Sequence, residues 1–395
     1  RIQTEGECVT MKLLHISDLH LGRRLGAYTL SEEQRAMLDW VYDTLCDTGA
    51  EVLLIAGDVY DRAVPGPDAV VALDRFLSRV HDRGIPICVT SGNHDSVERL
   101  SFASALLSGA DVYVSPPLAE GISHVTFTDA YGGITVWLLP FCRPAEVRDA
   151  GIAEVYTYSE AMAAVVGSLP IEQSGRNIAL AHQFLTGSVC AGSESVQIGG
   201  LDNVDAAIFA PFDYTALGHL HRHQSLAEGR IVYAGSPLCY DFGEAEDEKG
   251  AVLVEIGEKG TLTTTFLPYR NPLRRLVTLR GTYDELTARS YWESLRRDDY
   301  FRILLTDAED VPDAAAKLSV LYPRLLFLTY ENRSAIPGKG GGETDPDAPC
   351  DRGSAPEEVF ASFFAMQNDR ELTTEERAYI TALLARGEAE TDEAR

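Results

Sequence analysis

Short apolar runs alternate with amphipathic stretches through the first hundred residues of the chain. The expected strands are Lys12–Ser17, Glu51–Ala56 and Pro86–Thr90, and the expected helices are Ser31–Cys46, Pro67–Arg83 and Val97–Leu107. In the second helix, one side is expected to carry Val70, Val71, Leu73, Phe76, Leu77 and Val80. Ser31 and Gln34 have the spacing of a capping box at the start of the first helix. This alternation is typical of parallel strands covered by helices.

The middle of the chain is richer in strands. We expect them at Ile134–Leu139, Ile178–Ala181, Ala206–Phe209, Tyr214–Leu217 and Ile231–Ala234, with a hairpin formed by Ala251–Ile256 and Thr261–Leu267. After Pro268 the elements become shorter, with candidates at Leu273–Leu279, Tyr283–Leu286, Phe301–Leu305, Ala314–Leu318 and Leu325–Tyr330. The pattern predicts an α/β protein in which two sheets form a sandwich flanked by helices, followed by a small α+β domain and C-terminal helices.

Composition divides the chain further. The predicted parts are an upstream segment 1–10 before a native start at Met11, a main domain 11–267, an α+β domain 268–336, a linker 337–354 rich in Gly, Pro, Asp and Ser, helices in 355–387 and an acidic tail 388–395. Two amphipathic helices are expected after the linker. The first carries Val359, Phe360, Phe363 and Phe364, and the second carries Tyr379, Ile380, Leu383 and Leu384.

Five polar sets each follow one of the short apolar runs. They are Asp18-Leu19-His20, Gly57-Asp58-Val59-Tyr60-Asp61, Gly92-Asn93-His94-Asp95, Ala181-His182-Gln183 and Gly218-His219-Leu220-His221. In open α/β sheets, ligand sites gather beyond the carboxyl ends of the strands. Alternation along an extended strand would also put His219 and His221 on one side. We therefore predict that these five sets meet at one site.

The residue types at this predicted site favour metal binding. The candidate ligands are Asp18, His20, Asp58, Asn93, His182, His219 and His221. Imidazoles mixed with carboxylates and an amide suit Mn²⁺, Fe²⁺ or Zn²⁺ better than Mg²⁺. Asp58, in the middle of the set, is expected to bridge two ions, which together activate a water for in-line attack on a phosphoryl group. His94 is the candidate general acid, and Asp61 is expected to orient it or stabilise its charge.

The overall charge restricts the possible partners. The 34 basic and 60 acidic residues give a net charge of −26, which argues against broad non-specific DNA binding by this chain alone. It does not exclude DNA as a substrate, because bound cations or a partner can supply positive charge. The seven cysteines lack metal-site spacing and are typical of a reduced cytoplasmic protein. No run of about 18 apolar residues is present, so no membrane span is predicted.

The five sets together resemble the pattern of calcineurin-like metallophosphoesterases. The chain also resembles the SbcD family of nuclease subunits, through His15–Gly22, Ala181–Phe184, Gly218–His221, Ala234–Pro237 and the segment from Pro272 to Thr282. The resemblance implies a manganese-dependent nuclease that cuts DNA ends and hairpins in repair and recombination, located in the cytoplasm with the nucleoid. It implies that Asp18, His20, Asp58 and His221 hold one ion, that Asp58, Asn93, His182 and His219 hold the other, and that His94 is catalytic. It also implies that residues 268–336 form a capping domain.

The family resemblance also implies partners. SbcD-type subunits act with an SbcC-type ATPase that has a coiled coil, as a homodimer within a heterotetramer. The helices in 355–387 are expected to bind that ATPase, because amphipathic helices beyond a flexible linker suit a partner groove. The alternative is that their apolar residues pack into their own domain. For the homodimer, Pro67–Arg83 and Val97–Leu107 are the candidate interface.

Two other functions compete with this prediction. A protein phosphatase or cyclic-nucleotide phosphodiesterase of the same fold would use the same metal site, and Asp61-Arg62 has some likeness to the phosphatase motif. The phosphatase motif usually has Glu where this chain has Asp95, and such an enzyme would need neither the domain after Pro268 nor the terminal helices. A scaffold that has lost its metals is disfavoured because all seven ligand positions hold suitable residues.

Overall fold

The structure is a computed structural model that describes residues 10–189, 203–331, 373 and 377. Most of the predicted upstream segment, the linker, the C-terminal helices and the acidic tail lie outside the described residues. The described residues fall into two compact units, the first drawn from 1–280, 284–303 and 313–328 and the second from 281–283, 304–312 and 329–395. None of the described helices combines the length and apolarity needed to cross a membrane.

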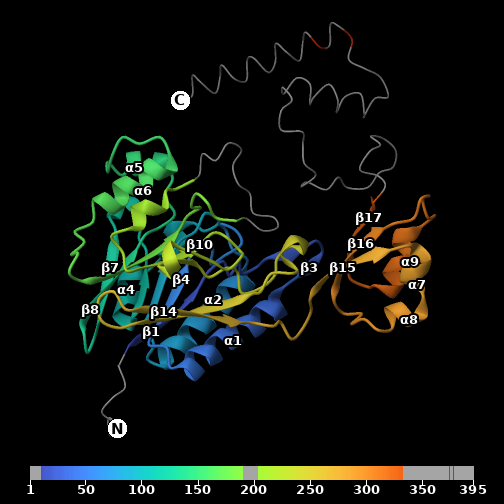
Figure 1. Cartoon of the computed structure of the whole chain (residues 1–395), viewed down its shortest axis with the longest axis horizontal. Coiled ribbons are helices and arrows are strands. Elements are labelled where there is room, and N and C mark those ends of the chain that lie inside the picture. Colours follow the sequence, from blue (N-terminus) through green and yellow to red (C-terminus); the bar gives the residue numbers. More distant parts are fainter. Residues whose placement is uncertain (1–9, 190–202, 332–372, 374–376, 378–395) are drawn as a thin grey trace. The chain divides into compact units, whose positions relative to one another are not determined.

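The first sheet of the main unit has six strands. Their order is β14 (Leu262–Pro268), β13 (Gly250–Ile256), β1 (Met11–Ile16), β4 (Val52–Ala56), β5 (Ile87–Thr90) and β6 (Val112–Val114). The last four are parallel, whereas β13 runs antiparallel to both β1 and β14. The helices connected to this sheet are α1 (Ser31–Thr48), α2 (Pro67–Asp82), α3 (Val97–Leu100) and α4 (Ser104–Leu107). In Figure 1, α1 and α2 lie side by side.

The second sheet also has six strands. Their order is β11 (Gln224–Leu226), β12 (Ile231–Tyr233), β10 (Tyr214–Gly218), β9 (Arg176–His182), β8 (Gly132–Leu138) and β7 (Ser123–Asp129). The four central strands are parallel, and the two edge strands are antiparallel to their neighbours. Helices α5 (Pro144–Asp149) and α6 (Tyr158–Gly167) lie together in Figure 1. The described 3₁₀ helices are η1 (Ser108–Ala110), η2 (Leu118–Glu120), η3 (Ala206–Phe209), η4 (Ala227–Gly229) and η5 (Phe242–Glu244).

The core consists of three apolar layers. The layer between the sheets joins residues such as Leu13 and Leu54 of the first sheet to Ile178 and Ala216 of the second, all fully buried. A second layer packs the first sheet against α1 and α2, and a third packs the second sheet against α5 and α6. The predicted two-sheet α/β sandwich flanked by helices is confirmed.

A three-stranded sheet follows the sandwich along the chain. Its order is β15 (Leu276–Gly281), β16 (Tyr300–Leu305) and β17 (Leu325–Tyr330), and its helices are α7 (Tyr283–Thr287), α8 (Arg289–Trp292) and α9 (Ala314–Leu321). A two-stranded ribbon, β2 (Arg24–Leu25) with β3 (Tyr28–Thr29), precedes α1. Within the second unit, the Tyr283 amide donates to the Asp307 carboxylate at 2.7 Å, and the Val311 amide donates to the Tyr330 hydroxyl at 3.1 Å.

Several expected elements differ in the structure. Ala206–Phe209 is the 3₁₀ helix η3, because the Asp205 carboxylate accepts the Ala207 amide and starts a turn. The expected helix Val97–Leu107 is interrupted between α3 and α4, where Ala103 has a φ of +60°. On α2, Val70 and Val71 are 43% and 45% exposed instead of lying on the buried side.

The capping box expected at the start of α1 is also wrong. Leu30 is the N-cap and the cap has no side-chain hydrogen bond. The Gln34 side chain instead accepts the Gly22 amide at 3.0 Å and donates to the His20 carbonyl at 2.7 Å. Gln34 therefore supports the loop that follows β1, next to a predicted metal ligand.

Candidate metal centre

The candidate ligands lie at strand ends from both sheets, in loops with unusual backbone geometry. β1 ends at Ile16 and β10 ends at Gly218, so Asp18, His20, His219 and His221 are not on strands. Positive φ angles occur at Asp18 (52°), His20 (41°), Asp58 (47°) and His219 (99°). Such left-handed residues cost about 1–3 kcal/mol each and cluster at functional sites. The expected alternation along a strand is therefore wrong here, because loop geometry directs these side chains.

Two glycines allow the loops to approach one another. A Cβ at Gly218 would lie 1.9 Å from the Ala56 carbonyl oxygen, and a Cβ at Gly92 would lie 2.1 Å from Asp58 Oδ1. Neither position has a positive φ, so close approach, not turn formation, explains these glycines. Gly57 differs from them, because its φ of +79° is in the left-handed region that favours glycine.

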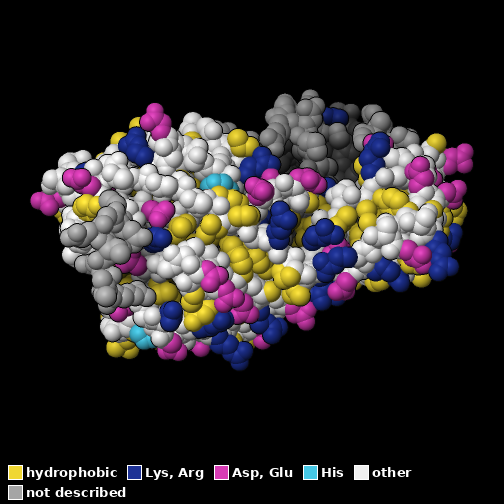
Figure 2. Space-filling model, turned by 60° about the horizontal axis from the view of Figure 1, so that its bottom comes forward, with side chains coloured by type: hydrophobic (Ala, Val, Ile, Leu, Met, Phe, Trp, Pro, Cys, Tyr) yellow, Lys and Arg dark blue, Asp and Glu magenta, His cyan; other side chains and the backbone are white. Residues whose placement is uncertain are grey.

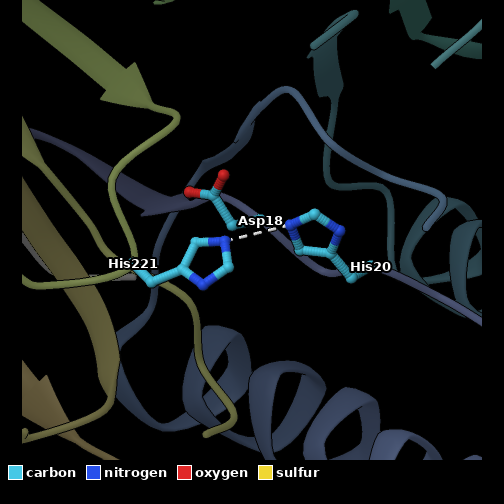
Figure 3. A group of neighbouring side chains, drawn as sticks. All are labelled: Asp18, His20 and His221. Atoms are coloured by element: carbon cyan, nitrogen blue, oxygen red, sulfur yellow. Dashed lines mark hydrogen bonds between the residues drawn. The ribbon is translucent and has the colours of Figure 1, made fainter. Parts of the chain in front are cut away.

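The first ligand set consists of Asp18, His20 and His221, whose side chains converge in Figure 3. One ligand atom from each lies within 4.8 Å of the others. His20 Nε2 faces His221 Nε2 at 3.1 Å. Two imidazole lone pairs repel each other at this distance unless a proton or a cation is present with them. This contact fits a divalent ion, because both nitrogens are common ligand atoms.

The second set consists of Asn93, His182 and His219. Asn93 Oδ1 lies 3.1 Å from His182 Nε2 and 3.0 Å from His219 Nδ1. Asp58 lies between the two sets, because its Oδ2 is 3.4 Å from His182 Nε2 and 3.6 Å from His20 Nε2. The structure thus brings together all seven predicted ligands. Four imidazoles, two carboxylates and one amide form a donor set that fits two divalent transition-metal ions.

The electrostatics of the cluster reflect burial and close charges. Burial opposes ionisation of Asp58, but His182, His20 and His94 outweigh it and hold the pKa of Asp58 well below its usual range. Burial also opposes protonation of His182, yet the Asp58 carboxylate raises its pKa to about 9. Burial, together with the positive charge of His182, lowers the pKa of His219 to about 3. In the absence of metal, the cluster therefore holds a proton on His182.

His94 is the most accessible histidine of the cluster. Its side chain is 39% exposed, and its Nε2 lies 3.9 Å from Asp58 Oδ2. The His94 amide donates to Asp58 Oδ1 at 2.9 Å, and its Nδ1–H donates to the Asp61 main-chain carbonyl at 3.0 Å. The Asp61 carboxylate instead accepts from Arg23 Nη1 at 2.9 Å. The observed contact of Asp61 with His94 is therefore made by its main chain and not by its carboxylate.

Asp95 joins two of the ligand loops. Its carboxylate accepts the amides of Gly92, Val59 and Tyr60 at 2.9–3.1 Å. Burial, followed by the charge of Asp58, raises the pKa of Asp95 to about 6. Asp95 therefore holds the loop after β5 against the loop after β4.

Sequence reasoning missed three supporting residues: Gln34, Glu244 and Lys249. Gln34 contacts the loop that carries His20, as described above. The Glu244 carboxylate accepts from His221 Nδ1 at 2.8 Å and from Lys249 Nζ at 2.8 Å. All three are buried, with exposures of 3%, 0% and 7%. Glu244 and Lys249 stand in an acidic, polar stretch typical of a surface loop, and only the fold shows that they are buried.

Comparison with known proteins agrees with this geometry. Residues 11–223 match the family of calcineurin-like phosphoesterases, and residues 272–368 match a family described as the type 5 capsule protein repressor C-terminal domain. The SbcD subunit of the nuclease SbcCD from Staphylococcus epidermidis is 30% identical over 324 residues, which cover 81% of this chain and 85% of the relative. The protein of the same name from Staphylococcus saprophyticus is 31% identical over 329 residues, with the same coverage.

A solved structure of a dimetal phosphatase from Danio rerio aligns with a TM-score of 0.42 and 11% identity, over 65% of this chain and 98% of that one. The family match covers more than half of this chain and includes all seven ligands. The chain belongs to the calcineurin-like phosphoesterase family and, within it, groups with the SbcD subunits of SbcCD nucleases. The predicted resemblance and enzyme class, a metal-dependent phosphoester hydrolase, are confirmed.

Proposed function

We propose that this chain is a Mn²⁺-dependent DNA exonuclease and endonuclease subunit that hydrolyses phosphodiester bonds at DNA ends and hairpins in repair and recombination. The observation that carries the proposal is the convergence of seven ligand residues at one site, with Asp58 between the two sets. The names of the two staphylococcal relatives, which are subunits of a nuclease, support a nucleic acid as the substrate. A cytoplasmic, nucleoid-associated location is part of the proposal.

The ligands divide into two groups in this proposal. Asp18, His20, Asp58 and His221 would hold one ion, and Asp58, Asn93, His182 and His219 would hold the other. When bound, two divalent ions would supply charge stabilisation for the phosphoryl group and lower the pKa of the attacking water. The Asp58 carboxylate, positioned by the His94 amide at 2.9 Å, would contact both ions.

His94 is the residue that would deliver a proton to the leaving oxygen. Its Nδ1–H is engaged with the Asp61 carbonyl, which fixes the ring and leaves Nε2 toward the cluster. When the imidazole is protonated, Nε2 carries the proton that the leaving alkoxide needs. A positioned general acid of this kind contributes about 10²–10⁴-fold to the rate.

An acidic chain needs a local source of positive charge to bind DNA. Acidic and basic side chains are interspersed on the face shown in Figure 2. Near the cluster, Arg23 contacts Asp61 and Arg143 Nη2 lies 3.4 Å from the Asn93 carbonyl. We infer that these arginines and the two ions bind the phosphates around the scissile bond, while the ATPase partner supplies most of the affinity for the duplex.

A comparison of substrates tests the proposed activity. The full chain is expected to cleave linear duplex and hairpin DNA with Mn²⁺, and to leave a phosphopeptide and a cyclic nucleotide largely unchanged. Asn93→Ala should abolish the cleavage, whereas His81→Ala, an exposed histidine on α2, should retain it. Efficient phosphopeptide or cyclic-nucleotide hydrolysis without DNA cleavage would support another phosphoesterase activity instead.

The partner is proposed from the C-terminal sequence, of which the structure describes only residues 373 and 377. An SbcC-type ATPase with a coiled coil is expected to bind the helices in 355–387. Deletion of residues 355–395 should abolish co-purification with the ATPase and leave cleavage of a small phosphodiester intact. A complex that survives the deletion would show that the ATPase binds elsewhere.

The α2 to α4 region is the proposed homodimer surface within a heterotetramer. Apolar side chains are exposed there on Val70 and Val71 (43% and 45%) and on Phe102 and Leu106 (80% each). Exposed apolar residues of this size mark interaction sites when they gather. The double variant Phe102→Glu with Leu106→Glu should convert a dimer to a monomer in light scattering. Phe327→Glu, at a 50% exposed site on β17, serves as the control.

A further inference from the structure

A buried charged network lies behind His221, on the side away from the other ligands. Glu244 accepts from His221 Nδ1 at 2.8 Å through Oε1. Its Oε2 accepts from Lys249 Nζ at 2.8 Å and from the Tyr240 amide at 3.1 Å. Glu244 is 0% exposed and Lys249 is 7% exposed. A buried carboxylate and a buried ammonium are costly to desolvate, so their place behind a metal ligand needs an explanation.

Lys249 fixes both ends of His221. Its ammonium donates to three acceptors: the His221 carbonyl at 2.9 Å, Ser236 Oγ at 3.0 Å and the Glu244 carboxylate. An ammonium group has three N–H donors, so all of them are used. The first contact holds the main chain of His221, and the last holds the carboxylate that contacts its ring. The network therefore restrains the histidine at its backbone and at Nδ1 together.

The orientation of His221 follows from these contacts. Because Nδ1–H donates to a carboxylate, the Nε2 lone pair is directed toward Asp18 and His20. A carboxylate behind a ligating histidine fixes its tautomer and increases its basicity toward the metal. Two other ligand histidines have no such carboxylate hydrogen bond at Nδ1: His182 Nδ1 donates to the Ala56 carbonyl, and His20 Nδ1 lies 3.7 Å from Asp61 Oδ1.

We propose that Glu244, held by Lys249, is a positioning residue that selects the Nε2-ligating form of His221 and strengthens one of the two metal sites. This rests on the proposed two-ion site, and it adds that the two sites differ in how their histidines are oriented. Both Glu244 oxygens accept hydrogen bonds, Oε1 from His221 and Oε2 from Lys249 and the Tyr240 amide, as the oxygens of a carboxylate do. Neither Glu244 nor Lys249 belongs to the ligand set, so both can be changed without removing a ligand.

Calorimetric titration of the metal-free full chain with Mn²⁺ tests the proposal. Glu244→Gln is expected to weaken one of the two binding events by about 10–100-fold and to change the other much less. Glu255→Gln is the matched control, because this 29% exposed carboxylate lies on β13 and pairs only loosely with Lys12, at 3.6 Å. Unchanged affinities in folded Glu244→Gln, within about twofold of the parent chain, would overturn the proposal.

A second variant separates positioning from folding. Glu244→Gln alone leaves Lys249 buried without its anion, which destabilises the fold. The double variant Glu244→Gln with Lys249→Met removes both charges and should fold more readily, but it should show the same loss at one metal site. Recovery of parental Mn²⁺ affinity in this double variant would mean that Glu244 serves folding alone.

The parent chain itself offers a readout that needs no variant to fold. In the Zn²⁺-loaded protein, nitrogen NMR should show one ligand histidine that binds through Nε2 and keeps an Nδ1–H strongly hydrogen-bonded to a carboxylate. The absence of such an imidazole would contradict the proposal. If the parent chain bound neither Mn²⁺ nor Zn²⁺, the proposed two-ion function would fail. If the parent chain bound two ions and the folded Glu244 variants bound both with parental affinity, only this inference would fail.

Discussion

The two ligand sets of the metal centre are supported in different ways. In the first set, Gln34 contacts the loop of His20, and Glu244 and Lys249 contact His221. In the second set, His182 Nδ1 donates to the main-chain carbonyl of Ala56. Side chains therefore orient His20 and His221 of the first set, whereas a main-chain carbonyl on another strand orients His182 of the second.

This difference separates what substitutions can alter. A main-chain carbonyl survives almost any point substitution, so the orientation of His182 depends on the fold of β4 and β9. Glu244, Lys249 and Gln34 can each be replaced singly, so the first set is the adjustable one. We expect substitutions outside the ligands to alter the first ion more than the second.

The largest effect is expected where the sets meet. Asp58→Asn removes the negative charge that both sets share. Substitution of a residue that only supports a ligand lowers metal affinity by up to about 100-fold, and Asp58→Asn should lower the Mn²⁺ affinity of both sites by more than that. DNA cleavage should become undetectable. Metal analysis after dialysis and calorimetry would measure this. Loss of only one ion would show that Asp58 does not connect the sets.

His94→Gln should have the next largest effect, because it removes the proposed acid and keeps all seven ligands. We expect kcat to fall by about 10²–10⁴-fold with both Mn²⁺ affinities nearly unchanged. Single-turnover cleavage of a labelled duplex would measure the rate, with His81→Gln as the control. Full activity would refute the role of His94, and a simultaneous loss of metal would place it among the ligands.

The pH dependence of metal binding should come third. Asp58 raises the pKa of His182 to about 9, so this imidazole is protonated below that pH and must lose its proton to bind an ion. Affinity for the second ion should therefore rise with pH between about 6 and 8, by up to about tenfold per pH unit. Titrations in buffers of different ionisation enthalpy would count the released protons. An affinity that does not change with pH would contradict this assignment.

The smallest effect is expected from Gln34→Leu, which changes only the support of the first set. The Gly22 amide and the His20 carbonyl each lose a side-chain partner, but the carbonyl keeps the Arg23 amide and Gly22 is exposed, so we expect a loss of about 0.5–1.5 kcal/mol, the contribution of an ordinary hydrogen bond. Urea unfolding of the metal-free protein would measure the loss, with Arg35→Leu at the next position of α1 as control. Equal stability of both variants would mean that water or the loop itself compensates.

The ligands were predictable because each follows a strand, and parallel strands bring their carboxyl ends to one edge. The supporting residues were not, because Glu244 and Lys249 reach His221 only through tertiary packing. Gln34 was misassigned for a related reason: its spacing from Ser31 suits a helix cap, but its side chain bonds to two main-chain groups of the loop after β1. At such positions, the local preference for a helix cap competes with hydrogen bonds that form only in the folded protein. The sequence reveals the local preference but not the long-range bonds.

The residue at position 218 helps to tell which related sequences encode active enzymes. Any side chain there would meet the Ala56 carbonyl oxygen, and the Cβ alone would come within 1.9 Å of it. The ends of β10 and β4 would have to separate, and with them His219 and Asp58. A genome survey that scores only the seven ligands would accept a chain with alanine at this position. We expect such a chain to be a poor hydrolase. The search pattern should therefore require glycine at position 218 as well as the seven ligands.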